Sequence, residues 1–293
     1  NQPTLMTQLM RRNRARRAQG KERRLAAREV FQGSACVART DEGQFVFAVD
    51  TMKIELVNVS FSYGSMLLLD KVNLELAQGQ LYAFFGMHKS GKATLLRIIA
   101  GVLMPNDGLA FVPPHLRVMH MSLTPLVFNV TLLSNIVFGA KLKDVGGLDR
   151  IRRICIRCGF GQEVLRLLGE EDPELDENEE PRTTAATWAK RFSSTDFARL
   201  NLVRGLVVNP EFMVMQMPLL AFGDGEARKL LDLLRSHIDE RGLGMSEVGR
   251  RYRRPRTVIF SSYNIERCSR ADAIYEVTSD HKVQEYKRRG GSL

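Results

Sequence analysis

One stretch of the chain, residues 81–102, constrains the fold more than any other. An apolar run suited to a buried strand ends at Gly86, and Gly91 and Lys92 follow with the spacing G-x-x-x-x-G-K. The residues after them carry apolar side chains at helical spacing. A strand, a glycine loop and a helix in this order bring backbone N–H groups and a helix N-terminus to one point, where an anion can bind. The stretch therefore predicts a phosphate-binding loop.

The loop departs from its usual pattern directly after Lys92. Ser or Thr normally follows, because its hydroxyl group holds the magnesium ion that bridges the phosphates, but this chain has Ala93. Lys89 adds a cation, although its side chain and that of His88 stand where such a loop bends closely around phosphate. Two interpretations stay open: weak, metal-independent nucleotide binding, or a loop that only preserves the turn from strand to helix.

Length and composition limit the remaining possibilities. With 293 residues, of which 44% are apolar and 26% charged, the chain can bury a core in one large domain or in one domain with a sub-domain. No window approaches the run of about 18 apolar residues that a membrane-spanning helix needs. We therefore expect no transmembrane segment in this chain, so that any membrane contact comes through a partner.

The four cysteines are too few and too unevenly spaced for a disulfide framework. Cys155 and Cys158 form a C-x-x-C pair, but no second pair or histidine cluster completes a zinc set. We therefore expect cysteines that pack in the core, and no metal site.

Positive charge gathers at the start of the chain. The net charge is +10, and residues 1–30 hold nine Lys or Arg side chains against two Glu. This segment is a solvated tail, an arm on RNA phosphate or on an anionic membrane surface, or a mitochondrial targeting sequence. RNA or an anionic surface is expected to meet residues 11–28 and the second basic cluster at 250–256. The acidic stretch EEDPELDENEE (170–180) is expected to be a solvated loop of the helical sub-domain or a docking site for a basic partner.

Four further stretches carry a resemblance to a known family. They are FSYG at 61–64, TPLVFNVTLLSNIVFG at 124–139, RFSSTDFARLNLVRGLVVNPEFMVMQMPLLAFGD at 191–224 and RTVIFSSYNIERCSRADAIYEV at 256–277. In order, they resemble the aromatic loop, the segment after the Q-loop, the run from signature helix to D-loop, and the switch strand of the nucleotide-binding domain of ABC transporters, particularly the exporter type. The resemblance covers nearly all of residues 51–287.

The resemblance implies an α/β fold: a P-loop ABC ATPase-like domain with a parallel core sheet, a small antiparallel β sub-domain and an α-helical sub-domain. The expected parts are a basic N-terminal arm over 1–50, the ABC ATPase-like domain over 51–293, and within it a helical sub-domain over about 125–205. We expect the antiparallel sheet to come from residues 53–84. We also expect FMVMQM (212–217) to be a central strand beside YAFFG (82–86).

The resemblance also assigns roles to single residues. Tyr63, in the aromatic loop, would stack on adenine. The phosphate-binding positions that the chain keeps are Gly86, Ser90, Gly91, Lys92 and Thr94.

The positions that handle metal and water in the family are changed. Where the family ends a strand in Asp-Glu, this chain has Gln216 and Met217, and the switch His is Tyr263. The Q-loop Gln falls on Leu123, and Ala93 removes the metal-binding hydroxyl. Phosphoryl transfer depends on positioning and on cations that absorb developing charge. These changes predict no catalytic residues, no metal and a pseudo-ATPase, which is not an enzyme.

Two functions are compatible with these features. The first is a catalytically inactive ABC ATPase-like protein that serves as a structural subunit of a multi-subunit protein assembly, such as an organellar ribosome or a respiratory-type complex, in the mitochondrion. The alternative is the degenerate nucleotide-binding half of an ABC transporter at the cytoplasmic face of a membrane. The signature becomes FSSTD (192–196), so both contributions to a shared ATP site are changed, which favours the first function.

The expected ligands and contacts are the same for both functions. We expect no cofactor, or weakly bound ATP or ADP without well-ordered magnesium. Residues 1–50 are expected to be the chief attachment to the partner, because they have no apolar face of their own to bury.

Overall fold

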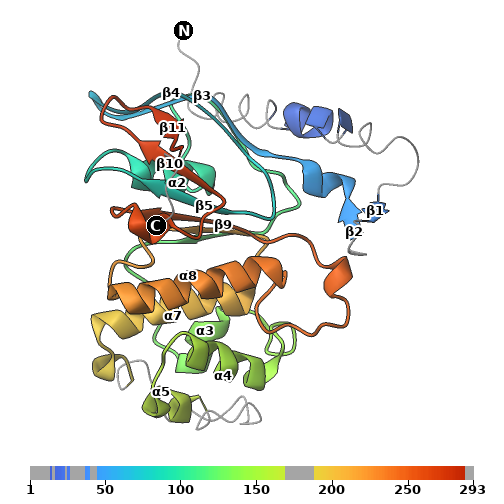
Figure 1. The fold of residues 1–293 in the computed structure, drawn as a ribbon, viewed down its shortest axis with the longest axis vertical. Coiled ribbons are helices and arrows are strands. Elements are labelled where there is room, and N and C mark those ends of the chain that lie inside the picture. Colours follow the sequence, from blue (N-terminus) through green and yellow to red (C-terminus); the bar gives the residue numbers. More distant parts are fainter. Residues whose placement is uncertain are drawn as a thin grey trace.

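Two of the three described β-sheets form layers with the helices, and the core sheet lies between the antiparallel strands and the long helices (Figure 1). The third is a separate two-stranded sheet of residues 37–39 and 45–47. The computed structural model describes residues 14, 17–23, 25–26, 37–39, 45–168 and 188–287. The acidic stretch 170–180 and a large part of the basic arm therefore lie outside the described residues.

In chain order the described strands are β1 (Val37–Arg39), β2 (Phe45–Phe47), β3 (Ile54–Tyr63), β4 (Met66–Leu76), β5 (Leu81–Phe85), β6 (Asp107–Phe111), β7 (Val118–Met121), β8 (Phe212–Met215), β9 (Thr257–Ser262), β10 (Ala273–Val277) and β11 (Val283–Glu285). The two longest described strands, β3 and β4, belong to the antiparallel sheet. The helices are α2 (Lys92–Ile99), α3 (Leu132–Val137), α4 (Gly147–Arg157), α5 (Gln162–Leu167), α7 (Ser194–Val208) and α8 (Asp224–Asp239).

The core sheet has the strand order β11-β10-β5-β9-β8-β7, and every neighbouring pair except β10 and β11 is parallel. One expectation is wrong here: β8 is in the sheet, but β9 lies between it and β5. The reason is that the chain crosses from β8 through α8 to β9, and β9 takes the position beside β5 with Leu81 opposite Val258.

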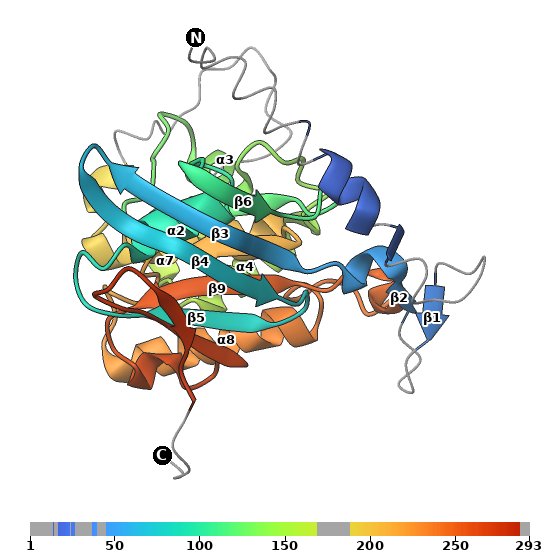
Figure 2. The same ribbon diagram turned by 90° about the horizontal axis from the view of Figure 1, so that it is seen from above.

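The antiparallel sheet has the order β4-β3-β6. Its third strand comes from Asp107–Phe111, and residues 81–85 belong to the core sheet, so the expected source of this sheet, 53–84, is only partly right. Strands β3 and β4 cross above the core sheet in Figure 2. Their apolar side chains face helix α2, which is buried between the two sheets.

The side chains of β5 alternate between two hydrophobic cores, so this strand belongs to both. Leu81 and Ala83 pack with the long helices, whereas Tyr82 and Phe84 pack with α2 and the antiparallel sheet. Successive side chains of a strand point to opposite faces, and a strand covered on both faces reads as a continuous apolar run. This is why the apolar stretch before Gly86 fits a buried parallel strand that delivers the loop to the edge of the sheet.

A buried arginine organises the helical layer. Arg150 of α4 is 1% exposed, and its guanidinium group donates hydrogen bonds to the carbonyl oxygens of Val145, Leu206, Val207 and Leu243 at 2.6 to 2.9 Å. Two of these carbonyls belong to the last turn of α7, where no intrahelical donor is available. Burial without an acidic partner lowers the pKa of Arg150 to about 10, so it remains charged at neutral pH.

A second buried arginine fixes the segment before α3. Arg204 of α7 donates to the carbonyl oxygens of Leu126 and Asn135 and to the side-chain oxygen of Asn135. Trp188, the single tryptophan of the chain, is 1% exposed and donates from Nε1 to the carbonyl oxygen of Val130 at 3.1 Å. These bonds hold residues 126–130 against the helical layer.

The described part of the basic arm lies on the antiparallel sheet. Residues 17–23 are helical, and Arg23 pairs with Glu55 of β3 while its guanidinium carbon lies 4.6 Å from the centre of the Phe111 ring. Gly20 is buried at the same place. The acidic group that holds this part of the arm therefore comes from the same chain.

Candidate nucleotide-binding site

The glycine loop joins β5 to α2 in a backbone conformation that needs both of its glycines. Gly86 and Gly91 have φ angles of 150° and 94°. A Cβ atom at these positions would lie 2.4 Å from the carbonyl oxygen of Val277 and 2.9 Å from that of Leu68. Lys89 has a φ angle of 62°, which costs a residue with a Cβ atom roughly 1 kcal/mol. The loop thus keeps its shape although Lys89 replaces a family glycine.

Lys92 is the central charge of the loop. Its Nζ donates to the carbonyl oxygens of Gly86 at 2.7 Å and Met87 at 2.6 Å, and to Oγ of Ser90 at 3.3 Å. The side chain is buried, and this desolvation lowers the pKa of Lys92 to about 8. The described residues around it offer dipoles instead of a carboxylate, so an anionic ligand would stabilise its charged form.

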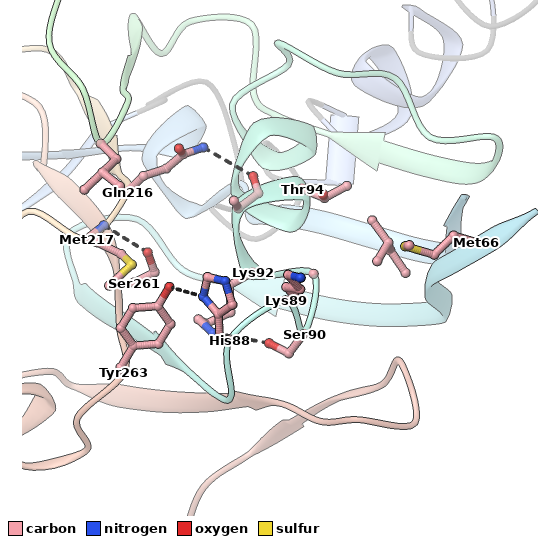
Figure 3. Close-up of a pocket in the computed structure, with 14 residues that line it drawn as sticks. Met66, His88, Lys89, Ser90, Lys92, Thr94, Gln216, Met217, Ser261 and Tyr263 are labelled. Carbon is pink, nitrogen blue, oxygen red and sulfur yellow. Dashed lines mark hydrogen bonds between the residues drawn. The ribbon is translucent and has the colours of Figure 1, made fainter. Parts of the chain in front are cut away.

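A cavity of about 360 Å³ opens at Lys92 (Figure 3). It is lined by Met66, Leu68, His88, Lys89, Ser90, Gly91, Lys92, Ala93, Thr94, Leu123, Gln216, Met217, Ser261 and Tyr263. None of these lining residues is Asp or Glu, whereas two are lysines and one is a histidine. The cavity is therefore suited to an anion.

The structure places most of the sequence-predicted site residues at this one cavity. Gly86 contributes through its carbonyl oxygen to Lys92, but it is not a lining residue. Tyr63 is also not among the lining residues; it is half exposed at the end of β3, with its ring edge-on to Phe61. Its partner in the sheet is Met66, which does line the cavity. The predicted adenine contact thus lies beyond the rim of the cavity.

Tyr263, at the family's switch position, closes one side of the cavity. Its hydroxyl oxygen lies 2.8 Å from Nδ1 of His88, and the two ring centres are 5.8 Å apart. The ring also lies over the ammonium group of Lys92, with Nζ 4.8 Å from the ring centre. Figure 3 shows the tyrosine and the histidine facing one another across the loop.

The residues at the metal positions do not fit a magnesium ion. Magnesium requires oxygen ligands in an octahedral arrangement, usually including carboxylates. Here Nε2 of Gln216 donates to the carbonyl oxygen of Ala93 at 3.3 Å and lies 3.0 Å from Nε2 of His120. The backbone N–H of Met217 donates to Oγ of Ser261. The described residues also contain no group of three or more His, Cys, Asp or Glu side chains that could hold a metal ion.

Three residues that line the cavity were not predicted from the sequence. Met66 and Leu68 reach the cavity because β4 runs beside the loop, and no local pattern marks them. Ser261 carried a signal, since two serines end the otherwise apolar strand β9 at the same sheet edge as the loop. The carboxyl ends of parallel strands are where ligands bind in such sheets.

The signature-like segment begins helix α7. Ser193 is the N-cap residue and accepts a hydrogen bond from the backbone N–H of Asp196. The carboxylate of Asp196 accepts from Ser193 and pairs with Arg199 at 2.9 Å. The acid that replaces a family residue is therefore neutralised within its own helix.

Part of the basic cluster at 250–256 is used inside the fold. Arg256 is 5% exposed, donates to Oδ1 of Asn209 and lies 3.5 Å from a carboxylate oxygen of Glu211. Arg253 donates to two backbone carbonyl oxygens. Arg251 is exposed, so the cluster offers a partner less charge than its sequence suggests.

The comparisons with known proteins agree with this geometry, although no family model matches the chain. A probable sulfate/thiosulfate import ATP-binding protein CysA of Chlorella vulgaris is 26% identical over 190 residues, which are 61% of this chain and 72% of that protein. CysA of Nitrosomonas europaea is 26% identical over 259 residues, 80% of this chain and 65% of that protein. The Fe(3+) ions import ATP-binding protein FbpC of Escherichia coli O157:H7 is 26% identical over 196 residues, which are 62% of this chain and 50% of that protein.

The architecture is an α/β P-loop fold like that of ABC ATPases, which confirms the predicted fold class. The relatives are ATP-binding proteins of import systems, and they support a nucleotide-binding domain of this type in the present chain. The matched region spans between half and about three quarters of the length of these three relatives. None of the helices that the structure describes has the length and apolar character needed to cross a membrane.

The prediction of a pseudo-ATPase that is not an enzyme is wrong. Several relatives are sulfate/thiosulfate import ATP-binding proteins, and none of those named here indicates an inactive member. The physical reason is that the changed positions do not decide activity by themselves, because the fold places other polar groups in the same cavity, such as Ser261, which the prediction did not consider. The relatives also give no support to the exporter subtype or to a mitochondrial location.

Proposed function

We propose that this chain is the nucleotide-binding component of an ABC-type transport assembly, and that it binds ATP or ADP at the cavity beside Lys92. The observation that carries the proposal is the buried ammonium group of Lys92 at the N-terminus of α2, bordering a cavity whose lining contains no carboxylate. The helix N-terminus and the loop N–H groups add favourable partial charges for phosphate. The import ATP-binding relatives support the same ligand.

Binding in this proposal does not need an ordered magnesium ion. The amide of Gln216 and the carbonyl group of Ala93 already bond to one another where the metal would be handled. The exposed side chains of Lys89 and His88 lie on the same loop and supply hydrogen-bond donors toward the phosphates. These groups would take over part of the charge neutralisation that magnesium normally provides.

We further propose that an apolar face beside α3 contacts a membrane-spanning partner at the cytoplasmic face of a membrane. Leu126 is 71% exposed, and the rings of Phe128 and Phe138 lie 5.6 Å apart and are both exposed. Arg204 and Asn135 hold this segment by backbone hydrogen bonds. A fixed, exposed apolar surface of this kind is characteristic of a protein interface.

Calorimetric titration with ATP and ADP, with excess EDTA and with magnesium, tests the binding proposal. We expect binding in EDTA, weakened at least about 100-fold by Lys92→Ala. The matched control is Arg97→Ala, also on α2 but outside the cavity lining, which should bind as the wild type does. Binding that requires magnesium, or that survives Lys92→Ala, would contradict the proposal.

A structural subunit of a larger multi-subunit assembly is the second candidate, and the basic arm favours it. Arg14, Arg17 and Lys21 are exposed while Arg23 is paired with Glu55, which leaves positive side chains open to RNA or another anionic partner. Purification of the native complex decides between the two candidates. Membrane-spanning subunits support the transport assembly, and RNA whose retention falls steeply with salt supports the second candidate.

A further inference from the structure

His88 and Tyr263 form a contact that the proposed binding site does not yet explain. The two residues come from the loop and from the segment after β9, and the hydrogen bond of 2.8 Å between them joins the two sides of the cavity. Within the described residues, Nε2 of His88 has no hydrogen-bond partner. The loop histidine is exposed, and Tyr263 contacts it through both the hydroxyl group and the ring.

The same tyrosine covers the charge that a phosphate group must reach. Lys92 has three N–H donors, and the loop supplies three acceptors for them. The Tyr263 ring lies 4.8 Å from the ammonium group. A phosphate chain that lies along the loop must therefore replace these acceptors and move the tyrosine away from Lys92, which also frees His88.

Resting on the proposed nucleotide binding, we propose that His88 is the residue that distinguishes a nucleoside triphosphate from a diphosphate, and that Tyr263 competes with the nucleotide for the His88 side chain. His88 stands two residues after the first glycine and four before Lys92, and both residues line the cavity, His88 exposed and Lys92 buried. A diphosphate lacks the terminal phosphate group, whose oxygen atoms can accept a hydrogen bond from the freed imidazole of His88.

The test compares the affinities for ATP and ADP, measured by calorimetry in EDTA for the wild type and three variants. We expect the wild type to prefer ATP about tenfold or more, because a hydrogen bond to a charged phosphate adds affinity of that order. His88→Ala should lose this preference, while His88→Gln, which keeps a donor, should retain part of it. Tyr263→Phe removes the bond to His88 but keeps the ring, so it should preserve the preference and strengthen ATP binding about threefold to fivefold.

Val102→Ala is the control, since Val102 follows helix α2, is 60% exposed and is not a lining residue of the cavity. It should leave both affinities unchanged. If Lys92-dependent binding persists but His88→Ala keeps the ATP preference, the role of His88 is overturned and the proposed function stands. If Lys92→Ala binds nucleotide as tightly as the wild type does, the proposed function fails and this inference fails with it.

Discussion

The helical layer and the phosphate loop each bury a cation among backbone carbonyl groups, and they do so for different purposes. Arg150 is enclosed on all sides, and its donors meet four carbonyl oxygens that have no other use for their lone pairs. Lys92 has three acceptors within one loop, and that loop borders a cavity.

The difference shows what decides whether a buried cation stabilises the fold or binds a ligand. A guanidinium group bonded to fixed carbonyls from three segments holds those segments together and cannot be released without exposing them. An ammonium group held by a loop can exchange its acceptors for phosphate oxygens at little cost. Removing each cation should therefore have opposite effects on stability, and the following predictions test this, from the largest expected effect to the smallest.

Arg150→Met should lower the free energy of unfolding by about 3 to 5 kcal/mol, because it leaves several buried carbonyl groups without donors. Urea unfolding followed by circular dichroism measures the loss. Arg153→Met is the matched control, since Arg153 is exposed on the same helix, and it should change stability by less than about 0.5 kcal/mol. Equal effects of the two variants would mean that the buried hydrogen bonds of Arg150 contribute little.

Lys92→Met should weaken nucleotide binding at least about 100-fold and at the same time stabilise the empty protein by about 1 kcal/mol. The physical reason is that the buried charge has only dipoles around it until phosphate arrives. Thermal unfolding with and without nucleotide checks both effects in one experiment. A variant that is less stable than the wild type without nucleotide would show that Lys92 is a structural cation like Arg150.

The affinity for nucleotide should fall with rising pH, by up to about tenfold per pH unit above pH 8. Burial lowers the pKa of Lys92 to about 8 in the free protein, and bound phosphate raises it again, so binding favours the protonated form. The stability of the empty protein should change in the opposite direction. Between pH 8 and 10.5 the unfolded chain binds more protons at this residue, so stability relative to Lys92→Met rises. A flat affinity between pH 7 and 9.5 would contradict the prediction.

Arg23→Ala should cost about 1 kcal/mol or less, because the Arg23–Glu55 pair is partly exposed and solvent screens it. A double-mutant cycle with Glu55→Gln, measured by urea unfolding, isolates the pair. A coupling energy above about 2 kcal/mol would mean that Arg23, like Arg150, is a structural cation, and that the arm is an integral part of the fold.

The sequence predicted the architecture well because the signals were local. The apolar run before Gly86, the glycine spacing and the helical period after Lys92 each depend on a few adjacent residues, and they suffice to place a phosphate loop between a buried strand and a helix. Strand order was predicted less well. No local pattern states that β9, which begins at Thr257, enters the sheet between β5 and β8.

The candidate site, too, was predicted only where the signals were local motifs. Lys92 and Gln216 were expected near one another because the resemblance fixes their motifs, and the structure places both on one cavity. The bond between His88 and Tyr263 joins residues 175 positions apart and depends on side-chain geometry, which no sequence pattern encodes. The unpaired charge of Lys92 also becomes apparent only when every lining residue is known.

Trp188 gives the molecule a built-in optical probe. It is the single tryptophan, it is buried, and its indole N–H bonds to Val130, while its ring lies edge-on to Phe192 at 5.0 Å. Its emission should therefore be blue in the native protein. A partner that displaces the 126–130 segment would shift that emission to the red without any label. Nucleotide at Lys92 would leave it unchanged unless the two surfaces are mechanically coupled, so one fluorescence spectrum can report whether ligand binding is transmitted to the partner face.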